Sequence, residues 1–438
     1  MNTTTNNPER FRISRVQQMR EEFLLAFCDS TALESWLLRD LSGRDWNKLL
    51  HWLDTSGLAL YFYDRLRELD RINLLPRAVR ERLEQNLSDN TERMRGMLAE
   101  LDAIQQDLLR AGVGYAVLKG FSLWPHSVPH PRLRSQLDID FLIAVSGIEK
   151  AIQVLKDRGY HLFAHSGNSW EFKKGQMREA SLKTLYKPVR YGCIELHVAA
   201  DRRRDAMLDR SQTIEYESVR MPVLSDADLF LGQGLHAFKH ICSESSRASH
   251  LLEFWHHVVA RRTDTAFWRD LRLVAEPFSR ASIELGVVLL IATQLMGEFA
   301  PDALTSWTVD RLPPYARLWV ELYGRRAVLG GSHGSKLYLL LQRELAADGA
   351  PASRSVGQVL VPRGLPTLMS YNPGGESLAD RLGRHRIQLQ VLYYRLRFHV
   401  LEDVRYLLHA ARWRNHMARL GRPQPQRLFS RNKGMTIR

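Results

Sequence analysis

Cysteine, long apolar runs and a secretory leader are scarce or missing in this chain of 438 residues, and each absence excludes a class of protein. The three cysteines, Cys28, Cys193 and Cys242, are scattered, so they form neither a metal-binding motif nor an even disulfide set. The longest apolar run, residues 285–296, contains polar side chains and is too short to span a bilayer. Because the polar N-terminus also lacks the basic and then apolar order of a signal peptide, we expect a cytoplasmic protein without a transmembrane segment.

The common nucleotide-binding and hydrolase motifs are absent as well. The sequence has no Gly-x-x-x-x-Gly-Lys-Ser/Thr loop, no Gly-x-Gly-x-x-Gly after a strand and no Gly-x-Ser-x-Gly elbow. Signatures of protein kinases are also missing. These absences argue against a P-loop NTPase, a Rossmann dehydrogenase, an α/β-hydrolase and a kinase.

Several histidines in the second half of the chain suggest a metal site at first sight. His236 and His240 are four residues apart on an expected helix, so they share one face. A zincin motif would need glutamate directly after the first histidine, and alanine stands there. No cysteine is suitably placed to complete a site. We therefore interpret these two, and the following His250, His256 and His257, as packing or polar-network histidines.

The formal charge of +14 has a general and a local origin. A basic surface attracts nucleic acid, acidic lipid or phosphorylated substrates. Arginine outnumbers lysine throughout, however, so we attribute most of the surplus to compositional bias. The local part is the segment from Arg381 to Arg438, where arginines are dense and acids are few.

An expected helix over residues 378–420 carries most of these C-terminal arginines, interleaved with aromatic residues. Nucleic-acid binding would use arginine on phosphates and aromatic rings for stacking. A membrane surface would instead accept the apolar face of a basic amphipathic helix. We favour a third interpretation, a helix packed on a bundle, because its apolar residues show core spacing. These residues are Leu389, Val391, Leu392, Tyr394, Leu396, Val400, Leu401, Val404, Leu407 and Leu408.

Periodicity predicts helices on both sides of a central β-type region. Thr31 to Glu34 resembles a capping box, and apolar residues follow it at helical spacing. Ser225 to Asp228 marks a second helix start after the β-type region. The predicted organisation is a polar tail (1–29), an N-terminal helical bundle (30–111), an α+β core (112–215), a C-terminal helical domain (216–347), a linker or long loop (348–377), and an Arg-rich amphipathic helix with a basic tail (378–438).

The central region reads as a small α+β unit with a mixed sheet. A helix over residues 147–158, closed by Gly159, separates the early strands from the later ones. Short apolar runs predict strands at 115–118, 137–145, 160–163, 170–173, 183–188 and 191–198.

Two carboxylates, Asp138 and Asp140, lie two residues apart inside the apolar strand 137–145. Because side chains alternate along a strand, both point to the same face. Adjacent like charges on a buried strand are costly unless a cation lies between them, and Mg²⁺ held by carboxylates and substrate phosphates is the simplest one. A solvated strand edge is the alternative, but the surrounding apolar residues disfavour it, since strand interiors disfavour aspartate.

Glu195 and His197 share one face of a later strand in the same way. Without further information, a cross-strand ion pair and a hydrogen-bonded histidine would explain these two residues. Lys119 and Arg134 lie in expected loops, where basic residues are commonly solvated.

The ordered set Leu118–Gly120, Arg134, Leu137–Leu142 and Ile194–His197 resembles the uncharacterised nucleotidyltransferase family of the polymerase-β-like superfamily. The resemblance covers roughly residues 30–260. It implies a minimal nucleotidyltransferase fold that uses a divalent metal ion and a nucleoside triphosphate.

The resemblance also assigns roles to individual residues. Asp138, Asp140 and Glu195 match the carboxylates that would hold Mg²⁺ or Mn²⁺ and serve catalysis. Two such ions would clamp the attacking and leaving oxygens of an in-line displacement.

Five residues would bind the nucleotide. Lys119 and Gly120 stand where the superfamily places a small-residue turn beside the triphosphate. The usual turn is Gly-Ser, and here it is Lys-Gly-Phe-Ser, so either Ser122 or the Lys119 ammonium would contact phosphate. Arg134 would neutralise phosphate charge, and His197 would lie beside the third carboxylate.

The expected function is transfer of a nucleoside monophosphate from a triphosphate to an acceptor hydroxyl on a small molecule, a sugar or a protein. Two alternatives stay open: an inactive nucleotide-binding or scaffold protein on the same fold, and a basic nucleic-acid-binding protein that uses the C-terminal segment. The sequence does not identify the acceptor or the preferred base.

Overall fold

The computed structural model describes residues 15–28, 41–175, 182, 184–188, 192–199, 202–243, 246–330, 334–349, 356–360 and 378–422. The expected capping box at 31–34, most of the linker 348–377 and the tail after 422 lie outside these residues. The chain divides into two compact units, residues 1–240 with 246–312, and residues 241–245 with 313–438. Each unit is described by itself below.

The first unit begins with helices, and those after residue 30 agree with the periodicity. The helices are α1 (Arg15–Cys28), α2 (Gly43–Ser56), α3 (Ala59–Glu68) and α4 (Arg77–Arg110). Helix α1 instead corrects the polar tail expected over 1–29, because its apolar side chains, Met19, Phe23, Leu24 and Phe27, are buried. The Ser42 side chain accepts a hydrogen bond from the Asp45 amide at the start of α2. Gly57, in the left-handed conformation with φ 77°, ends the same helix.

A seven-stranded mixed sheet follows and confirms the predicted α+β class with helical segments on both sides. Its strands have the order β3-β4-β5-β2-β1-β7-β6. Strand β1 pairs antiparallel with β2 and parallel with β7, and β2 pairs parallel with β5. The bounds are β1 (Tyr115–Leu118), β2 (Ile139–Ala144), β3 (His161–Ser166), β4 (Ser169–Lys173), β5 (Cys193–Ala199), β6 (Gln212–Tyr216) and β7 (Val219–Val223).

The strand expected at 183–188 is wrong. Residues 184–188 form a turn and bends, and Arg93 of α4 holds them by donating a hydrogen bond from Nη1 to the Leu185 carbonyl at 2.8 Å. Conversely, the sequence analysis missed the hairpin of β6 and β7. Strand β6 is exposed except around Ile214 and Tyr216, and β7 contains Pro222, so neither shows a clear strand pattern.

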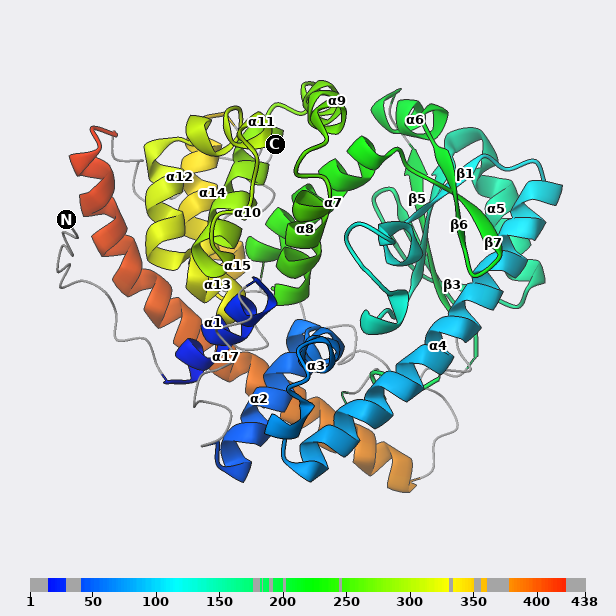
Figure 1. Ribbon diagram of the computed structural model, residues 1–438, viewed down its shortest axis with the longest axis horizontal. Coiled ribbons are helices and arrows are strands. Elements are labelled where there is room, and N and C mark those ends of the chain that lie inside the picture. The colour runs from blue at the N-terminus through cyan, green and yellow to red at the C-terminus, as the bar shows by residue number, and fades with distance from the viewer. Residues whose placement is uncertain are drawn as a thin grey trace, which may run out of the picture. The chain divides into compact units, whose positions relative to one another are not determined.

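The alternation of side chains gives the sheet two different faces. Ile139, Phe141 and Ile143 of β2 pack with α4 and α5 (Ile148–Asp157) in the larger apolar cluster (Figure 1). Leu142 belongs to a smaller cluster on the opposite face, with residues of β1, β5 and the segment after β7. Asp140 shares this second face with Leu142, because the two residues are separated by two positions.

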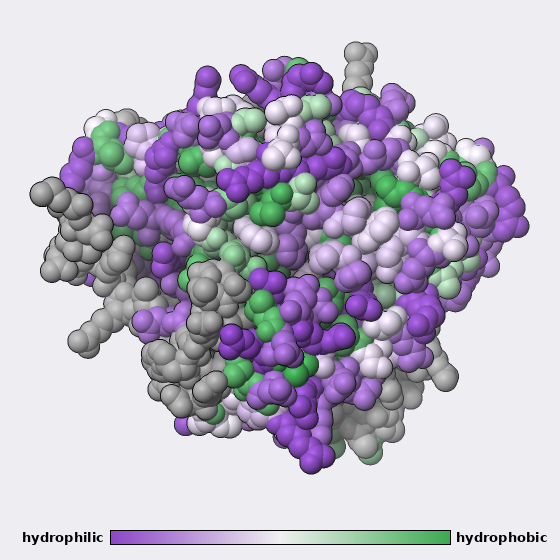
Figure 2. Space-filling model, viewed as in Figure 1, coloured by the Kyte–Doolittle hydropathy of each residue, from purple (hydrophilic) through white to green (hydrophobic). Residues whose placement is uncertain are grey.

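Helices complete the first unit after the sheet. They are α6 (Arg202–Asp209), α7 (Asp226–Ile241), α8 (Ala248–Ala260), α9 (Thr265–Ala275), α10 (Ala281–Met296) and α11 (Asp302–Thr305). The expected start at Ser225 is present, since the Asp228 amide donates to Ser225 Oγ at 3.2 Å. The longest apolar run forms α10, which is largely buried. Among the described residues, no helix has the length and apolar character needed to cross a membrane, and the face in Figure 2 is mostly hydrophilic.

The second unit is helical. It contains α12 (Pro314–Trp319), a π-helical turn (Val320–Gly324), α13 (Arg325–Leu329), α14 (Tyr338–Ala347), α15 (Val356–Leu360) and α17 (Leu378–Arg419). Trp413 of α17 donates its indole N–H to the buried Glu344 of α14 at 3.1 Å. Buried aromatic residues therefore fix the C-terminal part of α17 to this unit.

The expected packing of the long C-terminal helix is wrong for most of its apolar residues. Helix α17 buries Tyr406, Trp413 and Met417, but Leu389 is 66% and Leu396 is 62% exposed. The spacing of apolar residues shows that they share a face, but it does not show that another element covers that face. All the apolar residues named for this helix in the sequence analysis are exposed except Val391.

Candidate active site

Strand pairing brings the expected carboxylates to one place. Asp140 of β2 lies opposite Glu195 of β5, and Leu142 lies opposite His197. On the other side, Asp140 pairs with Leu118, the last residue of β1, so that Lys119 follows directly beside the acid. Asp138 lies just before β2, and the charges of Asp140, Lys119 and Arg134 act on its carboxyl group, but the close group of ligand atoms consists of Asp140, Glu195 and His197.

Asp140 is the centre of the cluster and is 1% exposed. Its Oδ1 accepts a hydrogen bond from Lys119 Nζ at 2.6 Å and lies 3.0 Å from His197 Nε2. Glu195 Oε2 lies 3.4 Å from His197 Nε2 and 3.9 Å from Lys119 Nζ, and the Glu195 carboxylate also accepts a hydrogen bond from Ser169. The ligand atoms of Asp140, Glu195 and His197 all lie within 4.8 Å of one another.

The carboxylates of this cluster have different electrostatic surroundings. Burial, together with the charge of Asp140, raises the pKa of Asp138 to about 6. The hydrogen bond with His197, helped by the one from Ser169, lowers the pKa of Glu195. Burial opposes the charged form of His197, but hydrogen bonds to Asp140 and Glu195 outweigh it and raise its pKa. The cluster therefore combines an Asp138 carboxyl that keeps its proton to a higher pH than usual with a Glu195 carboxyl that ionises more readily than usual.

A strained turn places Lys119 over the carboxylates. Lys119 has φ 52° and ψ −163°, a conformation that is rare outside glycine, and Gly120 follows with φ 49°. A Cβ on Gly120 would overlap the side-chain amide of Gln136, so only glycine fits there. Ser122 donates from Oγ to the Lys119 carbonyl at 2.8 Å and braces the turn. Burial opposes the Lys119 charge, but Asp140 outweighs it and raises the Lys119 pKa.

Arg134 forms a buried ion pair, which the sequence did not indicate. Its Nε lies 3.1 Å from Glu253 Oε1 of α8, and the Tyr61 hydroxyl donates to the same oxygen at 3.3 Å. Asn90 of α4 holds the backbone by donating to the Arg134 carbonyl at 3.1 Å. The signal that could have revealed Glu253 is a single acid inside the apolar helix run Leu251–His257.

A cavity of about 270 Å³ adjoins the cluster. Lys119, Ser122, Arg134 and His197 line it, so the structure brings these four predicted residues to one space. Its remaining polar wall comes from helices α7 and α8, and none of these wall residues was among the site residues predicted from the sequence. These residues are Asp228, Gln233, His236, His250 and Glu253.

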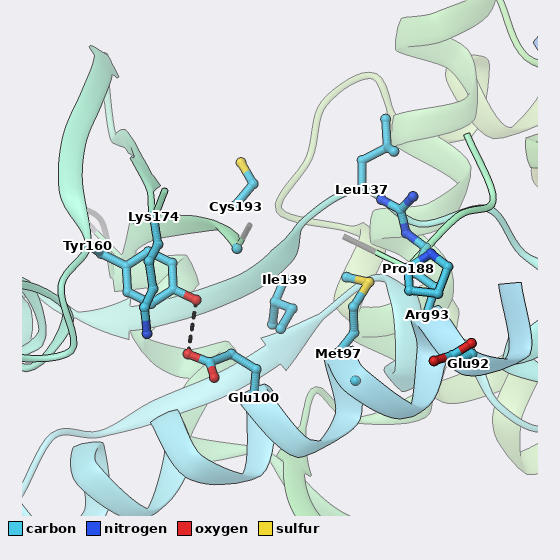
Figure 3. Close-up of a pocket in the computed structure, with 12 residues that line it drawn as sticks. Glu92, Arg93, Met97, Glu100, Leu137, Ile139, Tyr160, Lys174, Pro188 and Cys193 are labelled. Atoms are coloured by element: carbon cyan, nitrogen blue, oxygen red, sulfur yellow. Dashed lines mark hydrogen bonds between the residues drawn. The ribbon is translucent and has the colours of Figure 1, made fainter. Parts of the chain in front are cut away.

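A second cavity, of about 210 Å³, involves the other face of β2 (Figure 3). Ile139 lines it, together with Arg93 and Met97 of α4. At one side the Tyr160 hydroxyl donates to Glu100 at 3.0 Å, which is the dashed line in Figure 3. The described lining of this cavity contains none of the predicted site residues. Lys119 and His197, which contact Asp140, line the larger cavity instead.

A mixed sheet with an Asp-x-Asp pair beside a third carboxylate is the arrangement expected for a nucleotidyltransferase. Residues 42–297 match the model of a family described as uncharacterised nucleotidyltransferase, and the chain belongs to that family. This agrees with the resemblance seen in the sequence, and the match extends further into the helices after the sheet than residue 260.

Among solved structures, an antigenic nucleotidyltransferase-like protein from Paracoccidioides brasiliensis matches with 12% identity and a TM-score of 0.29. The match covers 50% of this chain and 98% of that protein. So distant a likeness supports no conclusion about the site. No curated protein matches the chain.

Proposed function

We infer that this protein transfers a nucleoside monophosphate from a nucleoside triphosphate to an acceptor hydroxyl and releases pyrophosphate. The observation that carries this proposal is the register of β2 against β5, which sets Asp140 beside Glu195 on one face of the sheet. Membership of a nucleotidyltransferase family gives the general reaction class. The acceptor is a hydroxyl of a small molecule, a sugar or a protein side chain.

The carboxylates fit a hard divalent cation. Asp138, Asp140 and Glu195 offer oxygen ligands, the type that Mg²⁺ and Mn²⁺ prefer. The raised pKa of Asp138 reflects burial and repulsion from Asp140, and a cation would relieve that repulsion. These three residues would hold the metal, which when bound supplies charge neutralisation at the transferring phosphate.

The chain's own residues position the nucleotide. Lys119 Nζ is partly exposed and lines the larger cavity, so it would contact a phosphate oxygen. Gly120 lets the backbone approach the triphosphate closely. His197 touches both Asp140 and Glu195 and holds the two carboxylates in place.

The proposed reaction is a single displacement. The acceptor oxygen forms a bond to the α-phosphorus while the bond from that phosphorus to pyrophosphate breaks, and the hydroxyl proton passes to a carboxylate of the trio. Positioning and charge neutralisation supply most of the rate enhancement in such reactions. Gln233 of α7 lines the cavity and would contact the acceptor.

The test is incubation of the purified full chain with each α-labelled nucleoside triphosphate, Mg²⁺ and a cell extract. We expect label on a product, and its loss in Asp140→Asn. Glu215→Gln, on edge strand β6 of the same sheet, is the matched control and should keep the activity. Label that persists in Asp140→Asn, or no labelled product with any of the triphosphates, would contradict the proposal.

One observation favours an alternative, an inactive nucleotide-binding protein on the same fold. Lys119 Nζ already compensates Asp140 at 2.6 Å and lies near Glu195, where a metal ion would otherwise supply the positive charge. In that case a triphosphate with Mg²⁺ would raise the melting temperature of the protein, and no pyrophosphate would be released.

A further inference from the structure

Three histidines come together at the larger cavity, and two of them, His236 and His250, line it. His236 and His240 stand one turn apart on α7, and His250 lies near the start of α8. Their ring centroids are 4.4 Å apart for His236 and His240, 5.0 Å for His236 and His250, and 4.6 Å for His240 and His250. One ring nitrogen of each histidine lies within 4.8 Å of the other two. The imidazoles therefore meet at one point from two helices.

The interpretation of these residues as packing histidines leaves a polar atom unexplained. His250 is 7% exposed, and its Nδ1 has no hydrogen-bond partner among the described residues. A buried polar atom without a partner costs about 1–3 kcal/mol, so such atoms are rare in folded proteins. Contact with the other two rings does not satisfy it.

The protonation states suit metal binding. Burial, together with the charge of His240, lowers the pKa of His236 to about 3. Burial likewise lowers the pKa of His250. Both imidazoles are therefore neutral at pH 7, which is the form that binds metal ions. Nearby positive charges that would oppose a cation are Lys119, Arg134, Lys239 and Arg247. The pairing of Arg134 with Glu253 and of Lys119 with Asp140 reduces this opposition.

We propose that His236, His240 and His250 form a binding site for a first-row transition-metal dication, with Zn²⁺ as the expected ion. Three imidazoles are an established Zn²⁺ ligand set, whereas Mg²⁺ prefers the oxygen ligands of the carboxylate cluster. In a tetrahedral Zn²⁺ site the ligand nitrogens are roughly 3.3 Å apart. The partly exposed rings of His236 and His240 can turn to close the remaining gap.

The proposed site leaves one coordination position for a ligand from the cavity. His236 and His250 line the same space as Lys119 and Arg134. Catalytic Zn²⁺ sites have three protein ligands and an open fourth position. A hydroxyl or anionic group of a small molecule in the cavity would occupy that position. Metal binding here does not depend on the proposed nucleotidyl transfer.

The test uses Zn²⁺ alone on the full chain after removal of bound metal with a chelator. Loss of an outer-shell partner weakens metal binding by up to about 100-fold, and loss of a ligand should weaken it further. We therefore expect His236→Gln and His250→Gln each to raise the dissociation constant for Zn²⁺ by more than about 100-fold. His256→Gln is the matched control, because His256 is also a mostly buried histidine on α8. Its Nδ1 lies 3.3 Å from the Ser127 carbonyl, and it is not one of the three clustered histidines. Circular dichroism checks that each variant is folded.

Asp140→Asn separates the two candidate metal sites. This substitution disrupts the carboxylate cluster, and we expect Zn²⁺ affinity at the histidines, and the visible absorption of a Co²⁺ substitute, to persist. If Asp140→Asn removes Zn²⁺ binding, or if His236→Gln binds as tightly as the original protein, the proposal is wrong. Equal loss in His256→Gln would also overturn it. Should His250→Gln fail to fold, the partly exposed His240→Gln provides the same comparison.

Discussion

The ion pair between Arg134 and Glu253 yields a prediction whose size follows from burial. The side chains are 15% and 2% exposed, and the two charged groups lie 3.1 Å apart. Glu253→Ala removes the carboxylate and leaves the Arg134 guanidinium without its partner. Breaking a buried pair in this way costs about 3–5 kcal/mol. Arg134 keeps some access to the cavity, so we expect a loss of about 3 kcal/mol in the free energy of unfolding.

The assay is urea unfolding of four proteins in a double-mutant cycle. They are the original chain, Glu253→Met, Arg134→Met and the double variant. Each single substitution leaves one charge buried alone, whereas replacing both partners by apolar side chains of similar volume is often nearly neutral. We therefore expect a coupling energy of at least about 2 kcal/mol. Glu81→Ala, which breaks an exposed pair with Arg77, serves as the control and should change stability by under about 0.5 kcal/mol.

Two results would refute this reasoning. One is a loss below about 1 kcal/mol in Glu253→Ala, which would mean that Arg134 reaches water without its partner. The other is additivity of the two single substitutions, because independent sites add and coupled sites do not. A buried pair is little screened, so the coupling should also survive in 1 M salt.

Three further predictions concern the carboxylate cluster. In metal-free protein, Lys119→Met should lower the melting temperature, because Asp140 loses its nearest cation. Added Mg²⁺ should then raise the melting temperature of this variant more than it raises that of the original chain. Protonated Asp138 contributes stability that is fully present below pH 3.8 and is lost as the pH rises through about 6. Asp138→Asn should therefore raise the melting temperature of metal-free protein at pH 7.5, and the gain should vanish near pH 4. Gly120→Ala should lower stability by about 1–3 kcal/mol in urea unfolding, because of its positive φ and the clash with Gln136.

The sequence was most informative where chemistry and pattern coincide. Asp138 and Asp140 break an apolar run, and this conflict with strand preference indicated a candidate site at this strand. The parallel pairing of β2 with β5 is a long-range contact, so the sequence alone could suggest Glu195 as a partner only through the family resemblance. The structure then supplied the register and the contacts to Lys119 and His197.

The parts that sequence reasoning missed depend on tertiary contacts. Glu253 reads as one acid in an apolar helix, and nothing local indicates that Arg134, more than a hundred positions earlier, pairs with it. The short apolar run near residues 184–188 suggested a strand, but a hydrogen bond from Arg93 holds these residues in a turn. Helix α17 has core-like spacing, yet Leu389 and its apolar neighbours are exposed, because periodicity does not specify a partner.

Strand β2 is a common wall of the two cavities. Its alignment therefore affects both the packing of the core and the formation of the candidate site. Ile139 faces the cavity beside α4, and its neighbour Asp140 faces the carboxylate cluster. A shift of β2 by a single position against β5 would bury the Asp140 carboxylate among apolar side chains and turn isoleucine toward Glu195 and His197. A chain misaligned in this way would be unstable, so well-folded molecules that lack the carboxylate cluster should not accumulate.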